Sequence, residues 1–399
     1  MRLLDITEFY SPWGGGVRTY LTEKARWVAR QGDLEHAIVL PGDRDHVDVW
    51  QRSRVYFVRG PAVPASPGYH FLIARNKLAE IVRLERPDVI EVGSPYTAPW
   101  LARRAARRAR FPSRLVAFVH ENPRLYAARA PRLVRSALDR SLASYLSAAH
   151  RTFALAVAAS PTNLTGFGVA RTAVVPLGVD TVLFRPAWRD PAWQEETGAW
   201  PGQPVALYAG RLSAEKGLDV VLDALPQVHA SLGLRLVVIG EGHLRPRLER
   251  LARERPGMLR VLPFEADRGR LARAYASADL FFAPCPYETF GLAALEAMAS
   301  GVPVVGVAAG GIGRLLFGAE WGRTYQVGDA ADCARAVHEL AALDLRALGA
   351  RARAAAVASY GWDRTFTELV GLYRRLLSEA PSTARARGTP PSSAPRISV

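Results

Sequence analysis

Short, largely apolar runs alternate with longer amphipathic segments along almost the whole chain. In the first half the apolar runs have the character of strands that are buried on both faces; they are Leu3–Ile6, Ala37–Leu40, Val55–Val58, Val89–Val92, Leu115–Val119, Thr152–Leu155 and Ala173–Val175. Helical periodicity appears between several of them, at Val17–Arg30, Phe71–Leu84, Ala98–Arg110 and Arg132–Ala148. This alternation predicts an α/β domain with a parallel sheet covered by helices on both faces.

The same alternation begins again after a stretch rich in Pro, Trp and Gly at residues 186–204. Its strand-like runs are Val205–Tyr208, Leu236–Ile239, Leu259–Leu262, Leu280–Ala283 and Val304–Val307, and a last helical pattern covers Trp362–Leu377. We therefore expect two Rossmann-like domains, at residues 1–182 and 200–360, with a boundary near 182–200. Residues 381–399 are rich in Pro, Ser and Arg, so we expect a disordered tail there.

Length and composition suit two soluble domains. The chain has 399 residues, 49% of them hydrophobic, which is enough for two cores. It has no apolar run of 18 residues, and its N-terminus lacks the pattern of a signal peptide. Its two cysteines, Cys285 and Cys333, cannot form a disulfide framework, so we expect a reducing, cytoplasmic location.

The positive charge is concentrated in the first domain. Residues 1–180 hold 26 Lys and Arg against 15 Asp and Glu, a net charge of +11 out of +15 for the whole chain. A basic surface attracts polyanions, anionic lipid headgroups or phosphorylated substrates, although arginines can also simply face water. The charge gathers in Leu101–Arg110, which carries Arg103, Arg104, Arg107 and Arg108, and in Arg132–Leu146, where Leu138, Leu142 and Leu146 make an apolar stripe.

A glycine run, Gly14-Gly15-Gly16, follows the first expected strand and opens a helix. Glycines there let backbone amides approach an anion, and the helix N-terminus adds partial positive charge. A diphosphate fits such a site. Taken alone the signal is weak, because a glycine turn between strand and helix is often only a turn.

A second loop, Tyr208–Gly217, follows the first strand of the second domain and carries Arg211 and Lys216. Ligands of Rossmann-like folds bind at such strand-to-helix loops. A guanidinium and an ammonium together suit a diphosphate whose charge grows as it leaves. Alternatively, both are exposed cations on a loop.

The third motif, Pro284–Glu296, contains Glu288 and Glu296 eight positions apart and leads from a strand into a helix. We expect Glu288 to precede the helix and to bind a sugar, and Glu296 to accept hydroxyls of a ribose. The backbone amides of Phe290, Gly291 and Leu292 would point at the ligand. Alternatively, one glutamate caps the helix and the other faces solvent.

His120 ends the strand Leu115–Val119. A side chain at the carboxyl end of a sheet strand faces the ligand crevice in open α/β folds. A lone histidine is more often structural, and only the other motifs favour a functional role.

These motifs together resemble the retaining glycosyltransferases of family 4, which have the GT-B fold. The resemblance covers nearly the whole chain and includes the inter-domain string Val175–Asp180. Within the family, the chain is most similar to bacterial GDP-mannose-dependent mannosyltransferases that act on phosphatidylinositol mannosides and related lipids. The strings Phe9–Thr19, Gly210–Lys216 and Glu288–Glu296 carry that likeness.

The resemblance implies a fold and a set of roles. Two parallel-sheet domains would face a cleft, with the helix at 362–378 crossing back to the N-terminal, acceptor-binding domain. The C-terminal domain would bind the donor, GDP-mannose or a UDP-sugar, without a metal ion or other cofactor. The implied catalytic residues are His120, Arg211, Lys216 and Glu288, with His120 beside the donor sugar. The implied donor-binding residues are Gly15, Gly16, Arg211, Lys216, Glu288, Thr289, Phe290, Gly291, Leu292 and Glu296.

Three other classes share some of these features. A nicotinamide dehydrogenase would carry a G-x-G-x-x-G fingerprint, which Gly14–Gly16 and the residues after it do not form. A sugar-nucleotide epimerase of the same fold would need no acceptor. A nucleic-acid-binding module would suit the pI of about 10.3, but no recognised nucleic-acid-binding motif accompanies the charge. We therefore expect an anionic lipid or glycan acceptor, peripheral membrane contact through the basic domain, and no nucleic acid.

Overall fold

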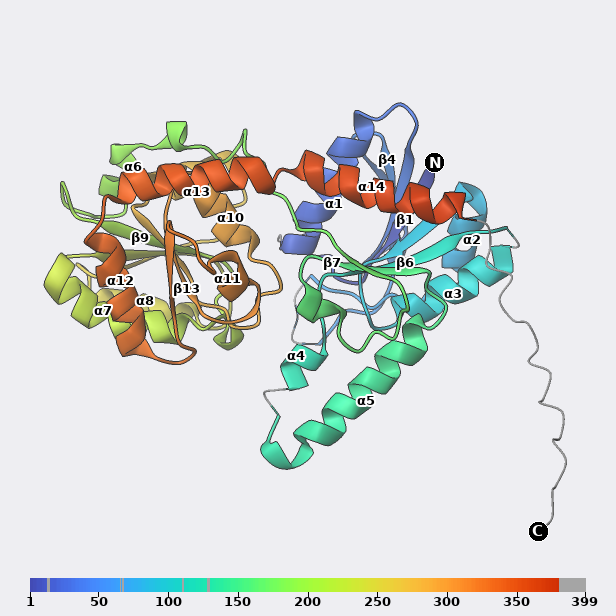
Figure 1. The fold of residues 1–399 in the computed structure, drawn as a ribbon, viewed down its shortest axis with the longest axis horizontal. Helices are drawn as coiled ribbons and strands as arrows, with labels where there is room; N and C mark the ends of the chain where they lie inside the picture. Colours follow the sequence, from blue (N-terminus) through green and yellow to red (C-terminus); the bar gives the residue numbers. More distant parts are fainter. Residues whose placement is uncertain (13–14, 65, 67, 110, 128–129, 380–399) are drawn as a thin grey trace, which may run out of the picture.

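The computed structural model describes residues 1–379 apart from 13–14, 65, 67, 110 and 128–129. The chain forms two α/β units, each built on its own sheet (Figure 1). The expected boundary at 182–200 falls between the two sheets. The tail at 381–399 and Gly14 lie outside the described residues.

The N-terminal sheet has eight strands in the order β3-β4-β2-β1-β5-β6-β7-β8. Their bounds are β1 Arg2–Ile6, β2 Glu35–Gly42, β3 His46–Trp50, β4 Ser53–Arg59, β5 Val89–Val92, β6 Arg114–Val119, β7 Leu155–Ala158 and β8 Thr172–Val174. The accompanying helices are α1 Gly16–Ala29, α2 Arg75–Glu85, α3 Ala98–Ala109, α4 Arg124–Ala127, α5 Arg132–His150 and the 3₁₀ turn η1 Pro161–Leu164. Because β1 pairs with both β2 and β5, the strand order reverses beside β1.

The C-terminal sheet has six parallel strands in the order β11-β10-β9-β12-β13-β14. These are β9 Val205–Ala209, β10 Arg235–Ile239, β11 Leu259–Leu262, β12 Leu280–Ala283, β13 Val304–Val307 and β14 Gly322–Tyr325. Helices α7 Leu218–Leu232, α8 Arg245–Glu254, α9 Arg268–Ser277, α10 Leu292–Ala299, α11 Gly310–Leu315, α12 Ala330–Ala341 and α13 Leu345–Ser359 belong to this unit. The connection between the units contains α6 Pro191–Glu196 and the 3₁₀ turn η2 Pro186–Trp188, and η3 Ala214–Lys216 precedes α7.

The architecture expected from the sequence is confirmed, with three local corrections. The strand expected at Thr152–Leu155 is β7, which begins only at Leu155, because residues 151–153 close the turn after α5. The strand β3 was not expected; it is antiparallel to β4 and largely exposed, so it lacks the apolar run of a buried strand. The edge strand β14 was missed for the same reason, since Arg323 and Thr324 interrupt its apolar pattern.

The last helix, α14 Trp362–Ser378, crosses back from the C-terminal unit and lies on the N-terminal one (Figure 1). Its start is fixed by a bridge between Val179 and Gly361. Its buried face includes Phe366, which packs against the rings of Tyr20 and Trp27 on α1. The helix therefore joins the two units a second time, independently of the connection at 175–204.

A buried ion cluster lies where α14 meets the N-terminal sheet. The Lys24 ammonium on α1 donates to Asp5 Oδ1 at 2.8 Å and to Glu91 Oε2 at 2.6 Å, and all three side chains are buried. Tyr20 donates to Glu91 Oε1 at 2.8 Å, and Tyr373 on α14 also donates to Glu91. Burial raises the pKa of Glu91, although Lys24 and these hydrogen bonds favour its charged form. The cluster links β1, β5, α1 and α14.

No helix among the described residues is both long and apolar enough to cross a bilayer.

Tyr373→Phe tests the contribution of α14 to the cluster. Loss of a hydrogen bond to a charged buried group costs about 1.5–3 kcal/mol. We expect the free energy of unfolding, measured by urea denaturation, to fall by that amount. Tyr69→Phe, in the loop before α2, is the matched control and should change it by less than about 0.5 kcal/mol. Equal effects of the two variants would contradict the assignment.

Candidate active site

Two strand-to-helix loops meet at the point where the order of the C-terminal sheet reverses. Strand β9 lies between β10 and β12, so the loops after β9 and β12 leave from adjacent carboxyl ends. Such a switch point is where open α/β sheets bind ligands. Arg211 and Lys216 follow β9, and Glu288 follows β12. The structure thus brings together three residues that are up to 77 positions apart in the sequence.

The cations of the first loop differ in their surroundings. Lys216 Nζ donates to Glu288 Oε2 at 3.0 Å, and the neighbouring Glu288 charge raises the lysine pKa well above its usual value. Lys216 is therefore cationic at any physiological pH. The Arg211 guanidinium is 64% exposed and lies 3.8 Å from Glu215. The Arg211 backbone is fixed because the Tyr208 hydroxyl donates a hydrogen bond to the Arg211 carbonyl at 2.9 Å. Arg211 is thus an accessible cation on a fixed loop.

Two helix N-termini, one from each unit, come close together at the end of the Glu288 loop. Helix α10 begins at Leu292, directly after Thr289, Phe290 and Gly291, and helix α1 of the other unit begins at Gly16, after Gly15. A Cβ atom added at Gly16 would lie 3.2 Å from Leu292 Cδ1, so the two helix starts approach closely. The dipoles and first-turn amides of both helices favour an anion near this contact.

A further glycine-containing loop, Gly310-Gly311, was not expected from the sequence and packs against the Glu288 loop. Gly311 donates its backbone N–H to the Glu288 carbonyl at 2.6 Å, and a Cβ atom there would collide with the Phe290 backbone. Only glycine allows the start of α11 to pack this closely on the Glu288 loop. The signal was available: Gly310-Gly311 follow the apolar strand Val304–Val307 as Gly14–Gly16 follow the first strand.

Glu296 lies further along α10 and is buried. Arg268 Nη1 donates to Glu296 Oε1 at 3.0 Å, and burial raises the pKa of the carboxyl despite this partner. Glu288 thus lies in the loop before α10 and Glu296 within it, as the spacing predicts. Glu296 already has a basic partner, which a bound hydroxyl would have to share.

His120 lies at the carboxyl end of β6 in the N-terminal unit, half-buried between Tyr20 and Phe118. Burial, together with the nearby Lys24 charge, lowers its pKa to about 3. The imidazole is therefore neutral at physiological pH, and its position depends on Tyr20, which belongs to the buried ion cluster.

Glu121, the next residue, was not singled out from the sequence. Tyr96 donates to its Oε1 at 3.4 Å, and burial raises its pKa while Arg211 and Lys216 of the other unit act to lower it. A carboxyl group whose surroundings include Arg211 and Lys216 of the loop after β9 belongs to the same site. Only the arrangement of the two units reveals it.

Among the described residues, no group of three or more His, Cys, Asp and Glu side chains could hold a metal ion. The chain does contain one Asp-x-Asp string, Asp43-Arg44-Asp45, in the turn between β2 and β3. All three residues are exposed, and Asp45 Oδ1 accepts the backbone N–H of Arg59 at 2.7 Å. Asp45 therefore closes the turn.

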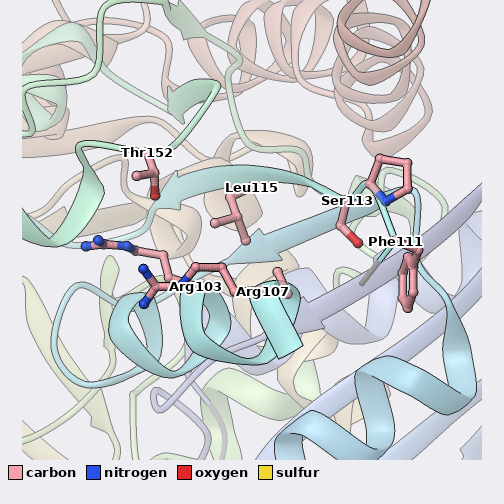
Figure 2. Close-up of a pocket in the computed structure, with 8 residues that line it drawn as sticks. Arg103, Arg107, Phe111, Ser113, Leu115 and Thr152 are labelled. Carbon is pink, nitrogen blue, oxygen red and sulfur yellow. The ribbon is translucent and has the colours of Figure 1, made fainter. Parts of the chain in front are cut away.

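A separate pocket of about 250 Å³ lies against α3 and is lined by Arg103, Arg107 and Thr152 among others (Figure 2). It opens near Leu115, at the amino end of β6, whereas His120 lies beyond the carboxyl end of the same strand. The pocket is thus at the opposite edge of the sheet from the residues described above.

Two family models match the chain. The model described as "Glycosyltransferase Family 4" matches residues 14–183, and the model described as "Glycosyl transferases group 1" matches residues 203–342. Each covers one of the two units.

Curated relatives and solved structures agree with these matches. A GDP-mannose-dependent alpha-(1-6)-phosphatidylinositol dimannoside mannosyltransferase of Mycobacterium tuberculosis is 33% identical over 76% of this chain and 79% of its own length. A GDP-mannose-dependent alpha-mannosyltransferase of Mycolicibacterium smegmatis is 30% identical over 94% and 98%. Sucrose-phosphate synthase from Thermosynechococcus elongatus superimposes with a TM-score of 0.75 over 95% of this chain and 100% of that one, at 20% identity.

The geometry predicts that Arg211 and Lys216 hold a nucleoside diphosphate group. Arg211→Ala and Lys216→Ala should each lower turnover of a nucleotide-sugar donor about 100-fold or more, the usual loss for one preorganised charge-stabilising group. Arg351→Ala, an exposed arginine of α13 paired with Glu320, is the control and should keep wild-type turnover. An Arg211→Ala enzyme with a near-normal rate would refute the assignment.

Proposed function

The chain belongs to glycosyltransferase family 4 and is a glycosyltransferase, and we propose that it moves a hexose, with mannose favoured, from a nucleoside diphosphate sugar to a lipid or glycan acceptor with retention of anomeric configuration. The observation that carries the proposal is that the loop of Arg211 and Lys216 contacts the Glu288 loop, which leads into α10, and that the start of α1 from the opposite unit approaches Leu292 at the start of α10. That arrangement concentrates positive charge where a diphosphate would leave.

The leaving group needs this charge most in the transition state. As the bond from the sugar carbon to the diphosphate oxygen breaks, negative charge grows on the diphosphate. Arg211 and Lys216, with the amides at the starts of α1 and α10, are in place before the reaction and stabilise that charge. The same groups can take the role of a divalent cation, so we propose that catalysis requires no metal ion or other cofactor.

The donor sugar and nucleotide would lie on either side of the diphosphate. Glu288 accepts hydroxyls of the hexose, assisted by amides of Thr289, Phe290, Gly291 and Leu292, and Glu296 accepts hydroxyls of the ribose. His120 lies beside the hexose as a neutral imidazole, because its pKa of about 3 keeps it unprotonated. Gly15 and Gly16 contribute amides from the N-terminal unit.

Retention follows if the acceptor attacks the face from which the diphosphate leaves. The acceptor oxygen bonds to the anomeric carbon as the bond to the diphosphate breaks, and the acceptor proton passes to the leaving phosphate oxygen. Every proton and charge is then accounted for without a protein nucleophile.

The names of the two mycobacterial relatives support GDP-mannose as donor and, for one of them, a phosphatidylinositol dimannoside as acceptor. The +11 charge of residues 1–180 supports an anionic acceptor bound by the N-terminal unit. A glycosylated phospholipid is both a lipid acceptor and an anion. A cytoplasmic enzyme would meet such a lipid at the cytoplasmic face of the membrane.

The membrane contact would be made by the arm that α5 forms beside the N-terminal unit (Figure 1). Leu133 at the beginning of α5 is 98% exposed, and Val134 and Leu138 are exposed too, next to the exposed Arg132 and Arg135. Each Lys or Arg near an anionic bilayer contributes about 1 kcal/mol. Two sequence expectations need correction: Leu146 is fully buried, and Arg103 is buried too and donates to the Ala148 carbonyl at the end of α5. The contact would therefore involve the exposed first part of α5, residues 132–138.

A donor screen tests the transferase. Nucleotide release should be fastest with GDP-mannose among GDP- and UDP-sugars, should rise when a crude lipid acceptor is added, and should be lost in Lys216→Ala. EDTA should leave the rate unchanged, because protein cations stabilise the diphosphate. Loss of activity in EDTA that magnesium or manganese restores would overturn the metal-free proposal, and no release from any donor would overturn the transferase.

Liposome sedimentation tests the membrane contact. The protein should pellet with phosphatidylinositol or phosphatidylglycerol vesicles, not with phosphatidylcholine, and salt should weaken the binding because it screens exposed charges. Leu133→Asp/Val134→Asp should abolish pelleting and preserve the melting temperature. Val47→Asp/Val49→Asp on the exposed strand β3 is the control pair and should pellet normally. No pelleting at low salt would leave a soluble acceptor.

A further inference from the structure

Three large aromatic side chains form a partly exposed surface beside the active site. Tyr96 lies in the loop after β5, Trp100 in the first turn of α3, and Tyr145 on α5. They are 40%, 42% and 38% exposed, respectively. We name Tyr96, Trp100 and Tyr145 the aromatic cluster. Exposed apolar groups that gather from separate elements mark interaction sites more often than isolated ones do.

Hydrogen bonds fix the members of the aromatic cluster to one another. Tyr145 donates its hydroxyl to the Tyr96 carbonyl at 2.5 Å, and Trp100 Nε1 donates to the Tyr145 hydroxyl oxygen at 3.3 Å. The rings of Trp100 and Tyr145 are 6.4 Å apart, and the Arg103 guanidinium lies 4.9 Å from the Trp100 ring. The cluster is therefore preorganised. Its contacts secure α5 against α3, yet they leave about two fifths of each side chain exposed.

Glu121 connects the aromatic cluster to the donor site. Its carboxylate accepts a hydrogen bond from the Tyr96 hydroxyl at 3.4 Å. The positive charges of Arg211 and Lys216, in the other unit, act to lower its pKa. Glu121 also directly follows His120. A carboxylate here would repel the donor diphosphate, so its ligand is a hydrogen-bond donor without negative charge of its own, such as a sugar hydroxyl.

We propose that Glu121 and the aromatic cluster form the subsite for a saccharide ring of the acceptor, an inference that rests on the proposed transferase function. The apolar C–H face of the ring packs on Trp100 and Tyr145, and Glu121 accepts a hydrogen bond from a ring hydroxyl. Mixed aromatic and hydrogen-bonding surfaces suit such amphipathic ligands. A lipid tail would need no carboxylate. The apolar side of α5, with Val134 and Leu138 on the same face as Tyr145 at about 3.6 residues per turn, leads away from this subsite toward the end of the arm.

Transfer to simple glycosides tests the subsite. Methyl and octyl glycosides of mannose, glucose and galactose serve as acceptors, and donor hydrolysis without acceptor is measured in parallel. Trp100→Ala should raise the KM for methyl and octyl glycosides alike by about tenfold, the scale of one lost aromatic contact, with donor hydrolysis preserved. Glu121→Gln should also raise the acceptor KM. Trp188→Ala, a tryptophan of η2 that is 44% exposed, is the matched control and should behave as wild type.

The outcomes separate this inference from the proposed function. Absence of donor hydrolysis in the wild type would contradict the transferase itself. Normal donor hydrolysis with an unchanged acceptor KM in Trp100→Ala and Glu121→Gln would overturn the subsite alone. An effect confined to octyl glycosides would show alkyl-chain binding instead, and a wild type that hydrolyses donor but uses no glycoside of the panel would also count against a saccharide subsite.

Discussion

The buried contact of Lys24 with Asp5 and Glu91 is the interaction on which the arrangement of the molecule depends. One ammonium and two carboxylates are removed from water, and removing Lys24 would leave two buried carboxylates without their cation. The cluster fixes α1 to β1 and β5, and Tyr373 adds α14 to it. Because α14 comes from the C-terminal unit, the same cluster helps to set where the two units face each other. It also positions Tyr20, which contacts His120.

The active site is assembled from charges that no single element supplies. Arg211 and Lys216 come from the loop after β9, and the helix N-termini come from α1 and α10 in different units. Each part is modest alone, because an exposed cation or a helix dipole is strongly screened by water. Bound between the two units, a diphosphate would lose that water and interact with all of them at once. A change in the position of α14 would therefore alter catalysis without touching the site.

In the proposed function, the N-terminal unit would combine a surface for the acceptor with one for a membrane. Glu121 lies near Arg211 and Lys216 and contacts Tyr96 of the aromatic cluster, and residues 132–138 of α5 carry exposed leucine, valine and arginine. An acceptor with a sugar headgroup and a lipid tail would match this order. The arginines of α3 and α5 have different roles. Arg103 is buried and stabilises the end of α5, whereas Arg132 and Arg135 are exposed to solvent.

The sequence alone determined the two α/β units, most strand positions and the strand-to-helix loops that carry Arg211, Lys216 and Glu288, because buried parallel strands and glycine turns are local patterns. Strands β3 and β14 could not be predicted from the sequence, because exposed or edge strands lack a continuous apolar run. Only the tertiary structure decided that Gly16 approaches Leu292 and that Glu296 pairs with Arg268. It also placed Glu121 near the cations of the other unit, Arg211 and Lys216. It also decided which arginines are buried. These contacts depend on how two separately folded sheets pack together, and no local periodicity encodes a distance between residues 90 positions apart.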